Sequence, residues 1–199
     1  ATLRAITAEL RPARHTAWIA AFDADAEEER VKVIEPELYP TEGRLHMGEI
    51  VRRVSEATGH RAVLVTDVGQ NQMMGVRYFQ YTETRSVVTS GGLGTMGFGL
   101  PAAIGAKIGA PERTVCLFVG DGGLQMTLEE LGTIMQEHLE VKIILLNNHF
   151  LGMVRQWQEL FFNERYSYTE MENPDFVAIA RAFRIAAREV SRREELDLS

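Results

Sequence analysis

The sequence has one cysteine, fewer basic than acidic residues and no long apolar run. A single cysteine excludes an internal disulfide framework and fits a reducing compartment. A net charge of −7 argues against nucleic acid or an acidic membrane surface as a partner. No apolar run reaches the roughly 18–20 residues that span a bilayer, so no membrane helix is expected. What is present, 45% hydrophobic and 25% charged residues among 199, is ordinary for a globular protein.

Neither end of the chain resembles a targeting segment or a natural domain boundary. The first residues fit neither a signal peptide nor a transit peptide, and the chain begins with Ala1 rather than Met. The last residues, 192–199, are typical of the start of a further helix. We therefore expect a piece of a longer protein, cytoplasmic in a bacterium, with an organelle as the alternative location.

From residue 62 onward, apolar segments alternate with stretches of helical periodicity. Strands are expected at the apolar segments, 62–66, 86–89, 114–119 and 141–147. Helices are expected near 47–58, from the glycine-rich segment 91–101 to 109, and at 128–138, 153–162 and 176–183. This alternation predicts the α/β class, as a doubly wound parallel sheet with helices on both faces. Residues 185–190 are a candidate edge strand, and we leave open whether the last strand of the sheet is present.

The first 40 residues differ from the rest of the chain. Residues 1–27 have helical periodicity with a break at Pro12. Residues 28–44 combine acidic side chains with two prolines, which is typical of a connector. We therefore divide the chain into a segment 1–40 and a domain 41–199.

Two polar motifs follow neighbouring strands of the expected sheet. Gly120-Asp121-Gly122 comes after one apolar run, and Asn147-Asn148 ends the next, with 24 residues between the motifs. Ligands of open parallel sheets bind at the carboxyl ends of the strands. Carboxylate and amide oxygens suit Mg²⁺, which also favours phosphate oxygens, and glycines let backbone N–H groups approach a phosphate. The pair of motifs therefore predicts a clamp for a metal and a diphosphate.

This spacing resembles the binding motif for thiamine diphosphate (ThDP). Residues 66–73 and 89–105 look like loops of the acetolactate synthase (acetohydroxyacid synthase) family, and 152–157, Gly-Met-Val-Arg-Gln-Trp, points to that family within the ThDP enzymes. The resemblance covers residues 40–190 and implies the C-terminal, ThDP-binding domain of the catalytic large subunit. Residues 1–40 are similar to the end of the family's central domain and its linker.

The resemblance implies three sets of site residues. Mg²⁺ would be held by side-chain oxygens of Asp121 and Asn148 and by the carbonyl of Phe150. The cofactor-binding residues would be Gly69, Gln70, Asn71, Gly94, Met96, Gly120, Asp121, Gly122, Gly123, Met126 and Asn148. Met153 and Trp157 would line the channel for substrate and inhibitors. Asn71 departs from the family, which commonly has His there, and so keeps a donor but loses any positive charge.

The resemblance also implies an activity. A ThDP- and Mg²⁺-dependent acetolactate synthase decarboxylates pyruvate and joins the two-carbon unit to a second 2-keto acid, pyruvate or 2-ketobutyrate, in branched-chain amino-acid biosynthesis. The family works as a homodimer or tetramer that shares the ThDP site, binds FAD in its central domain and can take a regulatory small subunit. The glutamate that activates ThDP belongs to the N-terminal domain, so we expect no catalytic residue in this chain and no activity from it alone.

Other functions remain open on the sequence. A different ThDP-dependent 2-keto acid decarboxylase, oxidase or carboligase would share the two strand-end motifs. A nicotinamide-binding oxidoreductase is disfavoured, because Gly92-Leu-Gly94 lacks the rest of a G-x-G-x-x-G fingerprint after a first strand. Intact Asp121 and Asn148 argue against a non-catalytic module. Cys116 lies within an expected strand and is interpreted as a buried thiol rather than a nucleophile.

Overall fold

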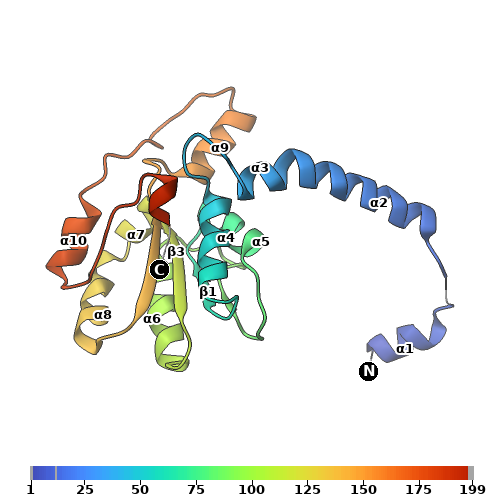
Figure 1. The fold of residues 1–199 in the computed structure, drawn as a ribbon, viewed down its shortest axis with the longest axis horizontal. Coiled ribbons are helices and arrows are strands. Elements are labelled where there is room, and N and C mark those ends of the chain that lie inside the picture. Colours follow the sequence, from blue (N-terminus) through green and yellow to red (C-terminus); the bar gives the residue numbers. More distant parts are fainter. Residues whose placement is uncertain (1, 12, 197–199) are drawn as a thin grey trace. The chain divides into compact units, whose positions relative to one another are not determined.

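The computed structural model describes residues 2–11 and 13–196, which form two compact units, Ala1–Pro40 and Thr41–Ser199. The second unit is built on one parallel sheet with strand order β2-β1-β3-β4 (Figure 1). The strands are β1 (Val63–Thr66), β2 (Val87–Val88), β3 (Val115–Gly120) and β4 (Val141–Leu146). All four predicted strands are therefore present. The candidate edge strand was wrong, because residues 185–190 have no regular structure.

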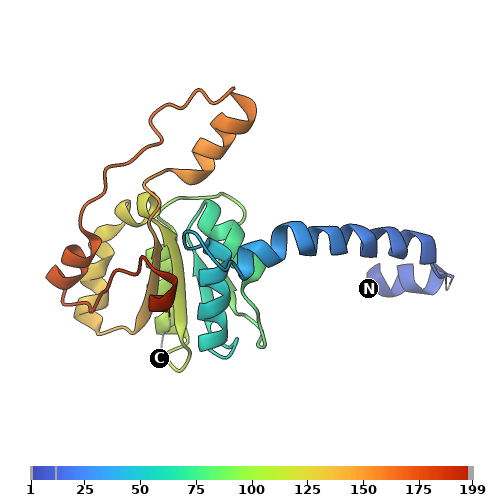
Figure 2. The same cartoon turned by 45° about the horizontal axis from the view of Figure 1, so that its top comes forward.

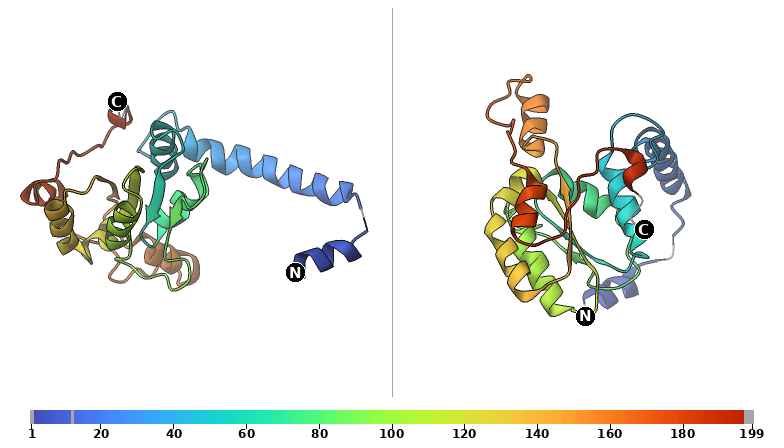
Figure 3. Two further views of the ribbon diagram at one scale, coloured as in Figure 1. Left: turned by 90° about the horizontal axis from the view of Figure 1, so that it is seen from below. Right: turned by 60° about the vertical axis from the view of Figure 1, so that its left-hand side comes forward.

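Helices cover both faces of the sheet, as the apolar strands predict (Figures 1 and 3). Successive side chains of a strand point to opposite faces, so each strand supplies two cores. Val63 and Val65 of β1 pack with α6 (Gly99–Gly109) and α8 (Leu131–Glu137). Leu64 packs on the other side with α4 (Met47–Ala57) and α5 (Gln70–Tyr78). The confirmed class is α/β, with a central layer that is buried on both sides.

Two helices near the cofactor motifs are not among the helices expected from the sequence. Helix α5 starts at Gln70, inside the segment 66–73 that resembles a loop of the family. Helix α7 (Asp121–Gln125) begins within the Gly-Asp-Gly motif and is followed by a short 3-10 helix, η2 (Leu128–Glu130). The remaining helical elements are α9 (Gly152–Phe161), α10 (Phe176–Ala182) and the 3-10 helix η3 (Arg193–Leu196). Figure 2 shows α9 standing away from the layers around the sheet.

The first unit is helical for most of its length. Its elements are α1 (Thr2–Glu9), α2 (Thr16–Glu29), the π-helix η1 (Arg30–Ile34) and α3 (Glu35–Leu38). The segment 28–44, predicted as a connector, is therefore helical up to Leu38. Arg30 pairs with Glu27 at 2.6 Å and bridges the junction of α2 and η1, while Pro36 occupies the first turn of α3, where its missing N–H costs little. No described side chain of this unit is buried.

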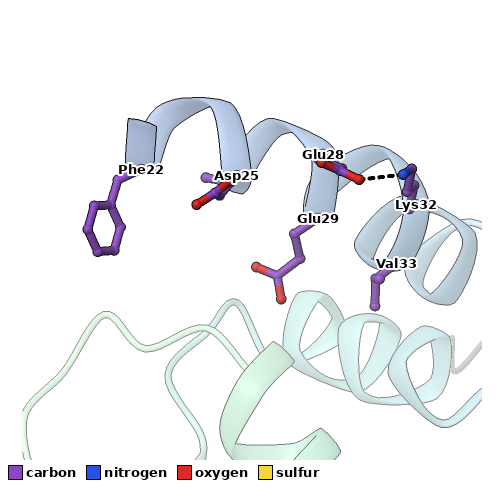
Figure 4. A pocket seen from close by; sticks show the side chains of 7 residues that line it. Phe22, Asp25, Glu28, Glu29, Lys32 and Val33 are labelled. Carbon is purple, nitrogen blue, oxygen red and sulfur yellow. Dashed lines mark hydrogen bonds and ion pairs between the residues drawn. The ribbon is translucent and has the colours of Figure 1, made fainter. Parts of the chain in front are cut away.

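A wide hollow runs along α2 and η1, and its lining comes entirely from the first unit. Figure 4 shows Phe22, Glu29 and Val33 at this hollow and the ion pair between Glu28 and Lys32. Its volume is about 540 Å³, but it contains none of the predicted site residues. Within the described ranges, no helix is both long and apolar enough to cross a membrane.

Candidate cofactor site

A cavity of about 210 Å³ lies where β1, β3 and β4 end. Most predicted site residues line it, namely Gly69, Gln70, Asn71, Gly94, Met96, Gly120, Asp121, Gly122, Gly123, Asn148, Phe150 and Met153. Met126 and Trp157 do not line this cavity, and both are about half exposed, at 51% and 56%. The cavity has further lining residues that were not predicted from the sequence as site residues, namely Met47, Val68, Leu146, Leu151, Gly152 and Val154. The binding role of each residue stays a prediction.

Asp121 is held firmly at the end of β3. The residue is 1% exposed and begins α7. Its Oδ1 accepts a hydrogen bond from the N–H of Gly122 at 3.0 Å. Its Oδ2 accepts from the N–H of His149 at 2.8 Å and from Nδ2 of Asn173 at 2.7 Å. Three N–H donors therefore orient this buried carboxylate.

The loop after β4 is fixed by its own pairing. Asn148 is partly exposed, and its Oδ1 accepts from the N–H of Phe150 at 3.1 Å. Residues 149–151 run antiparallel to 169–171, with hydrogen bonds from Leu151 N to Thr169 O and from Met171 N to His149 O, both 2.8 Å. The backbone at Phe150, the predicted carbonyl ligand, thus belongs to a short two-stranded segment rather than a free loop.

The glycines after Asp121 are required by packing as well as by their predicted role towards phosphate. A Cβ placed on Gly123 would lie 2.3 Å from Oδ1 of Asp67. A Cβ on Gly122 would lie 2.6 Å from a methyl carbon of Leu151. No side chain fits at Gly123 without moving the Asp67 carboxylate, and Gly122 requires the Leu151 side chain to move.

Asp67 is a site-organising residue that the sequence analysis did not single out. Its side chain is fully buried directly after β1. Its Oδ2 accepts from the N–H of Gly99 at 2.7 Å, and its Oδ1 accepts from the N–H of Gly97 at 3.2 Å. The carboxylate thereby fixes the glycine-rich turn that leads into α6, beside Gly94 and Met96. Its position after an apolar strand is the same signal that pointed to Asp121.

The donor set fits a metal bound to a diphosphate. Asp121 and Asn148 bring hard oxygen atoms to one cavity, where Mg²⁺ would leave several ligand positions to phosphate and water. Asn71 also lines the cavity and is 5% exposed, and its Oδ1 accepts no hydrogen bond from the protein. Because buried acceptors are nearly always paired, this oxygen fits a donor supplied by a ligand, such as metal-bound water. Among the described residues, this cavity included, no group of three or more His, Cys, Asp or Glu could hold a metal by itself.

The start of α9 forms the outer wall of the cavity. Nε2 of Gln70 donates to Oε1 of Gln156 at 3.2 Å, which ties this helix to the start of α5. The Arg155 guanidinium lies 4.0 Å from the centre of the Phe150 ring. The Trp157 ring packs against Phe161, 4.9 Å between ring centres, and faces outward. The wall is anchored through Gln156, and beyond it the apolar side chains of Trp157, Leu160 and Phe161 are exposed.

Cys116 has no part in this site. It lies in β3 with no exposed surface, and burial raises the pKa of its thiol to about 12. The thiol is therefore protonated at neutral pH, which confirms its interpretation as a core residue.

Comparison with known proteins identifies the class. Residues 67–198 match the family described as thiamine pyrophosphate enzyme, C-terminal TPP binding domain. The chain belongs to this family of ThDP-binding domains. The match includes both strand-end motifs, the Asp67 loop and α9.

Similarity to curated proteins confirms the resemblance to the acetolactate synthase family. The chain is 49% identical over 138 residues to the acetolactate synthase large subunit of Lactococcus lactis, covering 69% of this chain and 24% of that protein. It is 46% identical over 149 residues to the isozyme 2 large subunit of Escherichia coli, covering 74% and 27%. The mitochondrial catalytic subunit of Saccharomyces cerevisiae is 46% identical over 145 residues, covering 73% and 21%. The chain spans about a quarter of the length of these relatives.

Proposed function

We propose that the chain is the cofactor-holding part of an acetolactate synthase large subunit. The observation that carries this proposal is the cavity at the ends of β1, β3 and β4, in a chain whose relatives are acetolactate synthases. The reaction is the decarboxylation of pyruvate and transfer of the two-carbon unit to pyruvate or 2-ketobutyrate. Its products would enter branched-chain amino-acid biosynthesis.

In this proposal, the strand ends hold Mg²⁺ and the diphosphate of ThDP. Asp121 and Asn148 give side-chain oxygens to the metal, and Phe150 gives its carbonyl. The backbone N–H groups of Gly122 and Gly123 would offer hydrogen bonds to the diphosphate, for which the Gly122 N–H would have to share or leave Oδ1 of Asp121. Gln70 and Asn71 would contact the diphosphate from the start of α5. When bound, ThDP supplies a centre that stabilises the electron pair left by decarboxylation.

The glycine-rich turn and the start of α9 orient the reacting end. Asp67 fixes the turn, so that the Gly94 carbonyl can accept from the cofactor's aminopyrimidine and Met96 can fill the bend beneath it. Met126 would extend this apolar support from its place beside Gly97. Met153 lines the cavity and would exclude water from it, and Trp157, further along the same helix, would be part of the substrate channel.

The rest of the enzyme would come from outside this chain. Residues 1–40 would be the end of a central domain, whose remaining part binds FAD, and 41–199 the ThDP domain. The activating glutamate would come from an N-terminal domain of a neighbouring subunit in a homodimer or tetramer. A regulatory small subunit is the further partner that this function allows. The location would be the cytoplasm of a bacterium or, as in the relatives named mitochondrial, an organelle.

Two experiments test this function. The intact parent protein, given ThDP and Mg²⁺, should form acetolactate from pyruvate, and a panel of 2-keto acids distinguishes this activity from another decarboxylase, oxidase or carboligase. The 199-residue chain alone should form none. Calorimetry on the parent should show Mg²⁺-dependent ThDP binding and no binding of NADH. Failure to bind ThDP, or acetolactate formation by the isolated chain at the parent's rate, contradicts the proposal.

A further inference from the structure

The side chain of Asn173 connects the two strand-end motifs. Its Nδ2 donates to Oδ2 of Asp121 at 2.7 Å and to Oδ1 of Asn147 at 2.9 Å. Its Oδ1 accepts from Nε2 of Gln125 at 3.0 Å. Asn173 lies 52 positions from Asp121 in the sequence, in the irregular segment before α10, so no local pattern reveals this contact.

The amide of Asn173 has one favourable orientation. Both hydrogens of Nδ2 are engaged by oxygen acceptors, and the oxygen faces a donor. Turning the amide over would place its oxygen against the Asp121 carboxylate and lose all three hydrogen bonds. The network therefore presents a donor to Asp121 at a fixed place.

The backbone on either side of Asn173 is also held. On one side, Met171 donates its N–H to the His149 carbonyl at 2.8 Å. On the other, Pro174 restricts the preceding residue to extended conformations, and Asp175 caps α10 by accepting from the N–H of Ala178 at 2.8 Å. Asn173 is thus positioned by elements that do not depend on its own side chain.

We propose that Asn173 is a positioning residue for the metal site. It orients the Asp121 carboxylate and, through Asn147, holds the end of β4 at the distance that a single Mg²⁺ between Asp121 and Asn148 requires. The inference rests on the proposed function, because it concerns the same metal. Partners of metal-ligating groups typically change metal affinity by about 10–100-fold when removed.

The test compares Asn173→Ala with the matched control Gln125→Ala in the intact parent protein. The control removes the bond of Gln125 to the other side of the same amide and its bond to the Asp121 backbone carbonyl, and it leaves the bond from Asn173 to the Asp121 carboxylate in place. Mg²⁺ affinity is measured by titration at saturating ThDP, and ThDP affinity at saturating Mg²⁺. Melting temperature and circular dichroism report folding, and Asn173→Ser, which keeps a hydroxyl donor, replaces the alanine variant if that variant does not fold.

If Asn173 positions the metal site, only its substitution should lower the Mg²⁺ affinity. Asn173→Ala should weaken Mg²⁺ binding by about 10–100-fold. Excess Mg²⁺ should restore its ThDP affinity, and Gln125→Ala should stay close to the parent. Unchanged Mg²⁺ affinity, an equal loss in Gln125→Ala, or a ThDP defect that excess Mg²⁺ does not restore would overturn the positioning role. A parent protein without Mg²⁺-dependent ThDP binding would instead overturn the proposed function itself.

Discussion

The floor and the rim of the cavity are built in opposite ways. The floor consists of Asp121, Gly122 and Gly123, which line the cavity, together with Asp67 and Asn173, which contact them without lining it. The rim is the exposed part of α9, which lines the cavity only at its first residues. Both floor carboxylates are at most 1% exposed, and N–H groups donate two hydrogen bonds to Asp67 and three to Asp121. The rim instead leaves Val154, Trp157, Leu160 and Phe161 between 43% and 64% exposed. The chain thus fixes the part that would hold the diphosphate and leaves uncovered the part that would face substrate.

Among substitutions that test this difference between floor and rim, Gly123→Ala should cause the largest loss of stability. The new Cβ would lie 2.3 Å from a carboxylate oxygen that is itself fixed by Gly97. We expect a loss of about 3 kcal/mol in unfolding free energy, from overpacking and the disturbed hydrogen bond. Thermal or denaturant unfolding measures it. Gly105→Ala, where nothing lies within 4 Å, is the control and should be neutral or stabilising by about 0.5–1 kcal/mol. Equal effects would contradict the packing account.

Asp67→Asn should have a smaller but clear effect. The amide keeps one acceptor but places its NH₂ group against one of the two N–H donors of Gly97 and Gly99. The expected loss is about 1–3 kcal/mol of unfolding free energy, since a buried donor is left unpaired. ThDP affinity of the parent protein should fall with it, because the turn before α6 loosens. A variant with unchanged stability and affinity would show that the turn is held by other contacts.

Trp157→Ala at the rim should have the smallest effect. The ring is 56% exposed and packs mainly on Phe161, so unfolding free energy should change by less than about 1 kcal/mol. ThDP affinity should stay unchanged, while the KM for pyruvate in the parent enzyme should change. If ThDP binding were lost with an intact fold, Trp157 would belong to the floor, and the distinction between floor and rim would be wrong.

The sheet and the position of Asp121 and Asn148 could be predicted from the sequence for a physical reason. Each strand is a short apolar run that is buried on both faces, and polar residues directly after such runs must meet at one edge. That rule placed Asp121 and Asn148 at one cavity. Applied to β1, it would also have identified Asp67.

What the sequence missed depends on contacts between distant segments. The role of Asn173 requires residues 147 and 173 to fold back together, and an Asn-Pro pair alone indicates only a chain break. Helix α7 starts within Gly-Asp-Gly because β3 and the His149 loop fix its first residue, against the turn preference of glycine. At residues 185–190 the local pattern predicted a strand that did not form. An apolar segment stays irregular when it has no neighbouring strand to pair with.

The most direct test of the central claim is the Mg²⁺ dependence of ThDP binding in the intact parent protein and its Asp121→Ala variant. The account predicts that the parent binds ThDP only with Mg²⁺ present. The variant should lose at least about 100-fold in Mg²⁺-supported affinity while its helix and sheet content is retained, because the ligating carboxylate is gone. Unchanged ThDP affinity in a folded Asp121→Ala variant would contradict the account.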